Sequence, residues 1–262
     1  MNLLREYIHY LLTAKTRFGI HSPFVFDLVS NGMTVQMQKT TKNRLKKIRK
    51  DYLGDHRELL IHDEGAGSKK LGNKRKVAQI ARSASTKGVY GKLLYQLVKH
   101  YDCQRVLELG TSLGMGSFHM ALASEDCKVY TVDACSNTQQ EAKKTAETHG
   151  IQNIHFIHQN FNEYLNSEKQ VFDLVFIDGH HDGKALLNYL ERILPMTHDQ
   201  SLIILDDIRW SKDMFEAWQQ VIQDQRFHLS LDFFRMGVLL KRPEQAKEHF
   251  VIRLRNVIFG MI

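Results

Sequence analysis

The sequence is poor in cysteine and proline and has no long apolar run. Its cysteines, Cys103, Cys127 and Cys135, form no CxxC pair, so they favour neither a disulfide framework nor a zinc site. No uninterrupted apolar segment approaches the length that crosses a bilayer. The N-terminal stretch MNLLREYIHYLLTAKTR has charges within its apolar part and lacks a small-residue cleavage site. We therefore expect a cytoplasmic protein without a signal peptide or transmembrane segment.

Positive charge is concentrated in the first part of the chain. Residues 1–100 contain 20 Lys and Arg against 7 Asp and Glu, whereas residues 101–262 contain 16 against 22. The densest clusters lie at 39–50 and 69–76. Such clusters can attract an anionic small molecule, nucleic acid or acidic lipid, but a solvated helix face explains them equally well. The charge alone therefore identifies no partner.

The first 84 residues are predicted to form a basic, mostly helical extension. Apolar periodicity, capping residues and charge pattern predict helices at 2–16, from Ser22 and Pro23, at 39–54, near 75–84 and at 87–101. The segment 62–74 contains three glycines and has no apolar periodicity, which is typical of a mobile loop.

From residue 104 onward the sequence alternates between strands and helices. Short β-branched runs predict strands at 105–109, 128–133, 154–158, 172–178 and 201–207. This alternation indicates a mostly parallel sheet with right-handed crossovers. Two further runs, RFHLSLDFF and MGVLLKR, follow each other closely and predict an antiparallel hairpin. We therefore expect residues 85–262 to form a Rossmann-like α/β domain, with a seven-stranded, mostly parallel sheet that ends in this hairpin.

The strongest local motif is VLELGTSLGMG, residues 106–116. Its glycines, Gly110, Gly114 and Gly116, allow the chain to turn tightly from a buried strand into a helix, as a ligand lying against the main chain requires. Asp133 ends the next strand, where an acid can accept two ribose hydroxyls. The glycine spacing does not match the GxGxxG pattern of dehydrogenases.

Together with FDLVFIDG at the fourth strand, these residues resemble the class I S-adenosylmethionine-dependent methyltransferases over residues 83–242. The resemblance implies that Glu108 holds the amino end of the cofactor, Asp133 the ribose and Asn160 the adenine edge. The full set of expected cofactor-binding residues is Glu108, Gly110, Thr111, Ser112, Gly114, Asp133, Ala134, Asn160 and Asp178.

Two acidic clusters follow the fourth and fifth strands. Asp178 lies in IDGHHDG, and Asp206 and Asp207 lie in LDDIRW. Ligands of open α/β sheets bind at this edge, and carboxylates that converge there repel unless a cation or proton compensates them. The clusters resemble those of cation-dependent catechol and caffeoyl-CoA O-methyltransferases, in which Trp210 also has a counterpart. That resemblance implies Mg²⁺ or Mn²⁺ on Asp178, Asp206 and Asp207.

The same IDGxH…DD pattern also resembles sugar and macrolide O-methyltransferases, in which a histidine of this region is a candidate base. His181 stands where the cation-dependent enzymes carry lysine, and Asp207 stands where they carry asparagine. These differences leave open an alternative in which Asp206 and Asp207 cap the next helix and no metal binds. The expected catalytic residues are His181, of a residue type suited to general-base catalysis near neutral pH, and Asp178.

The resemblance implies O-methylation of a small-molecule or glycan hydroxyl. Only Pro23, Pro195 and Pro243 occur, so the chain has neither the D/N-P-P-Y/F loop of base amino-methyltransferases nor the Pro-Cys pair of carbon-5 base methylation. RNA or protein methylation, a non-catalytic binding module and an NAD-dependent oxidoreductase are the alternatives.

We expect residues 1–84 to cover the active site and select the acceptor, with the glycine-rich loop as the moving part; a surface loop is the alternative. The apolar C-terminus is expected to dock on its own domain or on a second subunit of a homodimer. Its apolar residues are Phe250, Val251, Ile252, Leu254, Val257, Ile258 and Phe259.

Overall fold

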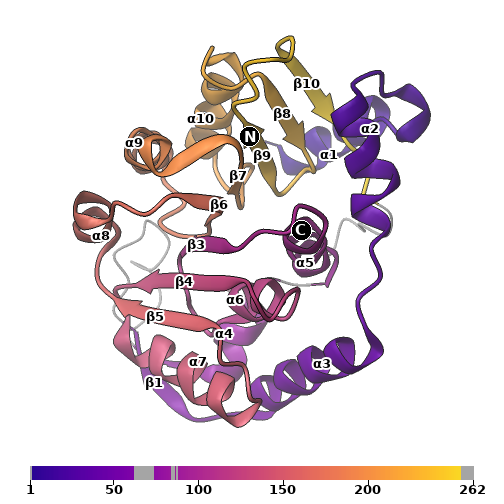
Figure 1. Ribbon diagram of the computed structural model, residues 1–262. Coiled ribbons are helices and arrows are strands. Elements are labelled where there is room, and N and C mark those ends of the chain that lie inside the picture. The colour runs from indigo at the N-terminus through magenta and orange to yellow at the C-terminus, as the bar shows by residue number, and fades with distance from the viewer. Residues whose placement is uncertain (1, 62–73, 84–85, 87, 255–262) are drawn as a thin grey trace.

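A central β-sheet organises the computed structural model, which describes residues 2–61, 74–83, 86 and 88–254. Its strands are β3 (Arg105–Leu109), β4 (Lys128–Asp133), β5 (Ile154–His158), β6 (Phe172–Ile177), β7 (Thr197–Leu205), β8 (Leu229–Asp232), β9 (Gly237–Leu240) and β10 (Glu248–Val251). They lie in the order β10-β8-β9-β7-β6-β3-β4-β5 (Figure 1). Strands β3 to β7 are parallel, and β9 runs antiparallel to both of its neighbours.

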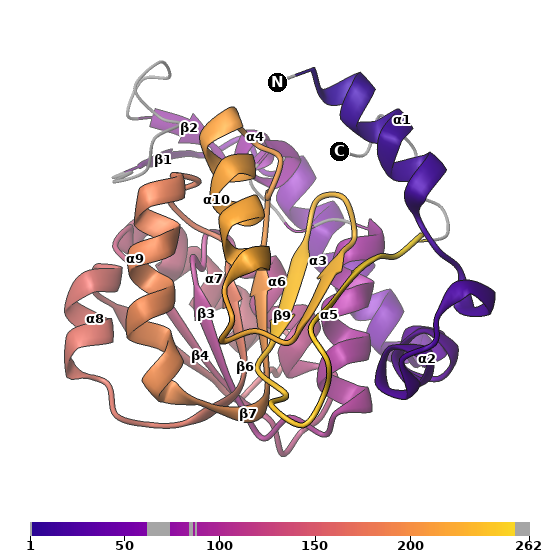
Figure 2. The ribbon, with the colours of Figure 1, turned by 90° about the horizontal axis from the view of Figure 1, so that it is seen from above.

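Helices cover both faces of this sheet. One face is covered by α5 (Gly88–His100), α6 (Met115–Ala121) and α7 (Ser136–Thr148), and the other by α8 (Phe161–Ser167), α9 (Gly183–Ile193) and α10 (Lys212–Gln223). Figure 2 shows α8, α9 and α10 together on one side of the strands. A short 3₁₀ helix, η3 (Leu194–Met196), leads into β7. Each parallel crossover therefore contributes a helix to a three-layer α/β architecture.

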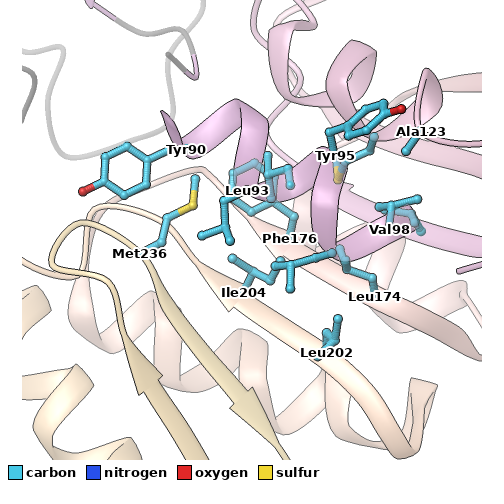
Figure 3. Close-up of a cluster of buried hydrophobic side chains, with 14 of the residues drawn as sticks. Tyr90, Leu93, Tyr95, Val98, Ala123, Leu174, Phe176, Leu202, Ile204 and Met236 are labelled. Carbon is cyan, nitrogen blue, oxygen red and sulfur yellow. The ribbon is translucent and has the colours of Figure 1, made fainter. Parts of the chain in front are cut away.

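The alternation of side chains along each strand divides the core in two. In β3, Val106 packs with the α5–α7 layer, whereas Leu107 and Leu109 pack with the α8–α10 layer. Figure 3 shows Leu93 of α5 beside Phe176 of β6 within the first of these clusters. Because both faces are covered, the strands are apolar throughout, as expected of a parallel sheet.

The N-terminal segment shares the core of the α5–α7 layer. It contains α1 (Leu3–Thr13), η1 (Arg17–Gly19), α2 (Pro23–Ser30), η2 (Gly32–Thr34), α3 (Lys39–Gly54), β1 (Glu58–Leu60), β2 (Lys74–Lys76) and α4 (Val77–Ser83). Ile48 of α3 and Val25 of α2 are fully buried in the same cluster as the sheet residues of that face. β1 and β2 pair antiparallel as a separate small sheet.

The start of the chain is hydrogen-bonded to its last described strand. The Tyr10 hydroxyl donates to the Ile252 carbonyl at 2.7 Å, and the backbone N–H of Leu254 donates to the Tyr10 oxygen at 3.3 Å. Phe250, Ile252 and Leu254 are buried in the same chain. The described part of the apolar C-terminus therefore docks on its own domain, and Val257, Ile258 and Phe259 lie outside the described residues.

The predicted architecture is confirmed. The five parallel strands lie where the sequence predicts them, and Pro23 occupies the first turn of α2. Two features were not predicted: β10, which extends the sheet to eight strands by pairing parallel with β8, and the β1–β2 pair. The glycine-rich loop falls outside the described residues except for Lys74. No helix in the described part of the chain is long and apolar enough to cross a bilayer.

Candidate active site

The predicted site residues gather at the carboxyl ends of β3, β6 and β7. The backbone N–H of Asp178 donates to the Leu109 carbonyl at 2.8 Å, and that of Asp206 donates to the Ile177 carbonyl at 2.9 Å. Gly110 has φ +111°, and a Cβ there would lie 2.1 Å from the Asp178 carbonyl oxygen. The glycine therefore permits a close approach that no other residue allows.

A pocket with about 200 Å³ of empty space joins the glycine-rich turn to Asp178. It is lined by Thr86, Glu108, Gly110, Thr111, Ser112, Leu113, Met115, Gly116 and Asp178. Four of the predicted cofactor residues besides Asp178 are among them. The pocket lies at the edge of the sheet where ligands of open α/β folds bind.

Glu108 is fully buried at the base of this pocket. Its carboxyl group accepts hydrogen bonds from the hydroxyls of Ser117 and Thr131, the latter at 2.7 Å. Burial raises the pKa of Glu108 to about 7, although these two hydrogen bonds lower it. A Cβ at Gly116 would lie 2.3 Å from the Glu108 carboxylate, which explains the third glycine of the motif.

Asp133 connects the end of β4 with the glycine-rich turn. Its carboxylate accepts the backbone N–H of Ser112 and that of Cys135, both at 2.8 Å. The half-buried Ala134 follows it in the chain. The carboxylate therefore holds the turn in shape, and its remaining lone pairs can accept hydroxyl donors.

Asn160 caps the N-terminus of α8. Its side-chain oxygen accepts the backbone N–H of Glu163 at 2.9 Å. The structure thus gives this residue a capping role, which fixes its position just after β5. Its predicted contact with adenine stays a prediction.

The acidic end of the site contains a residue that the sequence analysis missed. Arg235, in the turn between β8 and β9, donates from Nε and Nη2 to the two oxygens of Asp206 at 2.9 and 2.5 Å. Its Nε also lies 2.9 Å from Oδ1 of Asp207. Only 13% of the Arg235 side chain is exposed, and that of Asp206 is fully buried. One guanidinium thus pairs with both aspartates of the second acidic cluster.

Asp178 is buried beside this ion pair. Burial and then the negative charge of Asp206 raise its pKa well above the usual range, and Arg235 opposes them. Thr86 Oγ1 lies 3.5 Å from Oδ2 of Asp178. We therefore expect Asp178 to hold a proton near neutral pH, so that the three carboxyl groups do not carry three negative charges.

Two histidines follow Asp178 and face different surroundings. The ring of His180 bonds to the Tyr189 hydroxyl and lies against Phe161, so it has a packing role. Nε2 of His181 lies 3.6 Å from Oδ2 of Asp207, and its ring centroid is 5.6 Å from that of Trp210. His181 is therefore the histidine placed at the acidic end of the site.

Backbone strain concentrates in the same loops. The residues Ser112, His180, His181 and Asp207 have φ values of 46°, 65°, 35° and 51°. Non-glycine residues rarely adopt such angles, and surrounding structure must hold them there. Strain of this kind is typical of functional sites.

The order of the sheet, the glycine-rich turn after β3 and the acidic loops after β6 and β7 define a class I methyltransferase fold. Residues 107–208 match a family described as "Methyltransferase domain". By fold and by sequence, the chain belongs to the class I S-adenosylmethionine-dependent methyltransferases.

Curated proteins and solved structures of this group are similar to the chain. Tapetum-specific methyltransferase 1 of Arabidopsis thaliana is 28% identical over 137 residues, which cover 49% of this chain and 57% of that protein. The chain spans little more than half the length of the curated relatives it matches.

Two solved structures share the fold over most of their length. The methyltransferase PaMTH1 of Podospora anserina, solved with S-adenosylhomocysteine, has a TM-score of 0.59 at 14% identity and covers 85% of this chain and 97% of its own. The O-methyltransferase TomG of Streptomyces achromogenes, solved with S-adenosylmethionine, has a TM-score of 0.55 at 14% identity and covers 82% and 95%.

Arg235 could have been found from one feature of the sequence. It stands alone as a charged residue in the apolar run FFRMGVLL of the predicted hairpin. A charge in a buried hairpin needs a partner, and this hairpin pairs with the strand that ends in Asp206 and Asp207. No comparable signal marks Thr86, which reaches the pocket from the segment before α5.

Proposed function

We propose that the chain is an S-adenosylmethionine-dependent O-methyltransferase that acts on a hydroxyl of a small molecule or glycan. The observation that carries the proposal is that the pocket joins the glycine-rich turn directly to Asp178, next to His181 and Trp210. The pocket thus connects the part of the fold suited to the cofactor with residues that can handle a hydroxyl proton. The membership in the methyltransferase group supports the same function.

The contacts of the glycine-rich turn support a site for the cofactor. The Asp133 carboxylate is suited to accept the ribose hydroxyls, and the buried Glu108 lies where it can face the amino end. Gly110 and Gly114 keep side chains off the main chain there. When bound, S-adenosylmethionine supplies a methyl group on a sulfonium, whose C–S bond electrons remain with sulfur as the methyl leaves.

His181 is the proposed general base. Asp207 lies opposite its Nε2, so an Nε2–H directed at that carboxylate leaves the lone pair of Nδ1 to accept the hydroxyl proton. The acceptor oxygen then has an electron pair for the new C–O bond. Alignment of this oxygen with the methyl group contributes most of the acceleration, and a base adds about 10²- to 10⁴-fold.

The surroundings of His181 favour an acceptor with a flat or ring-shaped body. Trp210 is 60% exposed although it is large and apolar, and its ring lies beside that of His181. An exposed indole next to a base can stack on an aromatic or sugar ring and hold its hydroxyl toward the histidine. The acceptor class therefore follows from Trp210 together with His181.

A divalent cation does not fit the acidic residues as they stand. Both oxygens of Asp206 and one of Asp207 are bonded to Arg235, and Asp178 is buried in a setting that favours its protonated form. The described residues contain no group of three or more His, Cys, Asp or Glu side chains arranged to hold a metal ion. Mg²⁺ or Mn²⁺ on these aspartates stays a prediction, and we derive no step through it.

The extension over residues 1–84 is proposed to cover the cofactor side of the site. The Tyr52 hydroxyl of α3 donates to the Leu113 carbonyl in the glycine-rich turn at 3.0 Å. Asn137, near the start of α7, donates from its side chain to the Leu60 carbonyl of β1 at 2.7 Å. The extension thus contacts both sides of the region that Asp133 organises. The proposed moving part at residues 62–73 lies outside the described residues.

The function is tested with S-adenosylmethionine that carries a labelled methyl group, offered with a panel of phenolic and sugar hydroxyl acceptors. We expect label in an O-methyl product, found by mass spectrometry. His181→Ala should lower the rate by about 10²- to 10⁴-fold, and the loss should shrink as the assay pH rises, because hydroxide replaces the base.

His198→Ala is the matched control, because His198 pairs with Asp173 at the start of β7, at the opposite end of the strand from Asp206. Its rate should equal that of the wild type. Equal rates for the His181 and His198 variants would show that His181 is not the base, and label on nitrogen only would contradict O-methylation.

A further inference from the structure

The acidic end of the site is compensated by the chain itself. Arg235 lies in the turn between β8 and β9, and its backbone carbonyl accepts the N–H of Ile208, one residue after Asp207, at 2.9 Å. The turn is thereby fixed against the loop that carries both aspartates. The guanidinium also lies over the ring of Tyr90, with 5.8 Å from its central carbon to the ring centroid. Arg235 is thus held by several elements in one orientation.

The contacts of Arg235 use the carboxylate oxygens that a metal would need. Two of its nitrogens bond to the two oxygens of Asp206, and Nε also lies 2.9 Å from Asp207. A planar guanidinium matches a carboxylate through such paired hydrogen bonds, which a compact cation cannot form. Burial lowers the pKa of Arg235, but attraction to Asp206 and Asp207 more than offsets this, so the charge is permanent.

We propose that Arg235 is a built-in cation that takes the place of a divalent metal in this site and, through Asp207, positions His181. The proposal rests on the proposed function for its catalytic part. Asp207 contacts Arg235 with Oδ1 and faces His181 with Oδ2, so the arginine fixes the carboxylate that orients the base. Arg235 is therefore a positioning residue, and the enzyme works without an added metal ion.

The neighbouring buried pair provides a matched comparison. Arg209 donates to both oxygens of Asp232 at 2.8 and 2.6 Å, in the same hairpin region, and neither residue contacts the predicted site. Its side chain is 7% exposed, close to the 13% of Arg235. Removal of either guanidinium therefore leaves a buried carboxylate, but only removal of Arg235 leaves two aspartates side by side.

The experiment measures binding of Mn²⁺ alone to the full chain, by the loss of the free-ion signal in electron paramagnetic resonance. Wild type should bind no stoichiometric Mn²⁺ at concentrations that saturate ordinary enzyme sites. Arg235→Gln should bind Mn²⁺ about tenfold or more tightly than wild type. Arg235→Gln combined with Asp206→Asn should lose this gain, and Arg209→Gln should not acquire it.

Methyl transfer gives a second measure that a purely structural role would not change. Wild type should keep its rate in EDTA, Arg235→Gln should lose rate, and Mn²⁺ should restore part of the loss. The rate of Arg209→Gln should not respond to Mn²⁺. Thermal unfolding of each variant identifies any that do not fold, and the wild-type measurements decide the question in that case.

Two results would overturn the proposal. The first is one tightly bound Mn²⁺ per wild-type chain that Asp206→Asn abolishes, because the aspartates would then prefer the metal to Arg235. The second is a folded Arg235→Gln that binds no more Mn²⁺ than wild type. S-Adenosylhomocysteine binding, measured on the same samples, separates these outcomes from failure of the proposed function, since a chain that does not bind it is not a methyltransferase whatever its Mn²⁺ affinity.

Discussion

The two ends of the pocket hold their carboxyl groups by different means. At the cofactor end, Glu108 and Asp133 accept hydrogen bonds from hydroxyls and backbone N–H groups, and no basic side chain bonds to them in the described contacts. At the acidic end, Asp206 and Asp207 share the full positive charge of Arg235. Dipoles that a turn supplies suffice for separate carboxyl groups, whereas adjacent carboxylates need a cation. The first end is therefore prepared for a ligand, and the second is already compensated.

The largest effect is expected where this charge balance is broken. Asp206→Ala leaves the buried guanidinium of Arg235 with only Asp207 as its close partner, and loss of one partner of a buried pair costs about 3–5 kcal/mol of unfolding free energy. Denaturant unfolding measures the change.

Arg226→Gln is the control for this prediction, because Arg226 pairs with Glu191 and Asp224 while 47% exposed. An exposed pair contributes about 1 kcal/mol or less. Similar losses in the two variants would mean that the buried pair has no special role.

The sequence predicts the cofactor end better than the acidic end for a physical reason. Gly110 and Asp133 act within contiguous segments, where strand, turn and helix follow one another and fix the geometry locally. Arg235 reaches Asp206 only because β9 inserts between β7 and β8, a pairing between distant segments. The sequence predicted the hairpin, but not which residue of its turn would face the aspartates. The strand β10 was missed for the same reason, since its pairing with β8 depends on the chain returning from beyond β9.

The next effect concerns the close approach between the two ends. Gly110→Val places a branched side chain at φ +111° against the Asp178 carbonyl, which should destabilise the fold by about 3 kcal/mol and abolish S-adenosylhomocysteine binding. Thermal unfolding and calorimetry measure both.

Gly54→Ala is the control, because a Cβ there meets nothing within 4 Å, and its stability should change by less than about 1 kcal/mol. A Gly110→Val variant with wild-type affinity would show that the turn is not the cofactor site.

The cofactor end should also show its protonation in the pH dependence of stability. Burial raises the pKa of Glu108 to about 7 from the model-peptide value of 4.5, so the folded protein keeps a proton that the unfolded chain releases. The free energy of unfolding should therefore fall as pH rises from about 4.5 to about 7, by at most about 3 kcal/mol from this residue. Asp178 acts in the same direction.

Glu108→Gln removes this contribution, so its stability relative to wild type should rise between about pH 5 and pH 8. Chemical unfolding across that range measures it. Parallel pH curves for the two proteins would contradict a protonated Glu108.

The smallest effect concerns the contact between the extension and the glycine-rich turn. Tyr52→Phe removes the hydrogen bond to the Leu113 carbonyl and should cost about 1 kcal/mol of unfolding free energy. If the extension supports the cofactor end, S-adenosylhomocysteine affinity should fall by a few-fold as well. Tyr164→Phe loses a bond to Glu168 within α8 and should leave that affinity unchanged. Equal affinities in both variants would limit the extension to a role in stability.

The most direct test of a prepared cofactor end beside a self-compensated acidic end is calorimetric titration of the wild-type chain with S-adenosylhomocysteine in the presence of EDTA. We expect binding at micromolar concentration, about −8 kcal/mol, with the same affinity after Mg²⁺ is added in excess, and no heat with NADH. Absence of heat with S-adenosylhomocysteine while NADH binds, or binding that appears only with the metal, would contradict the account.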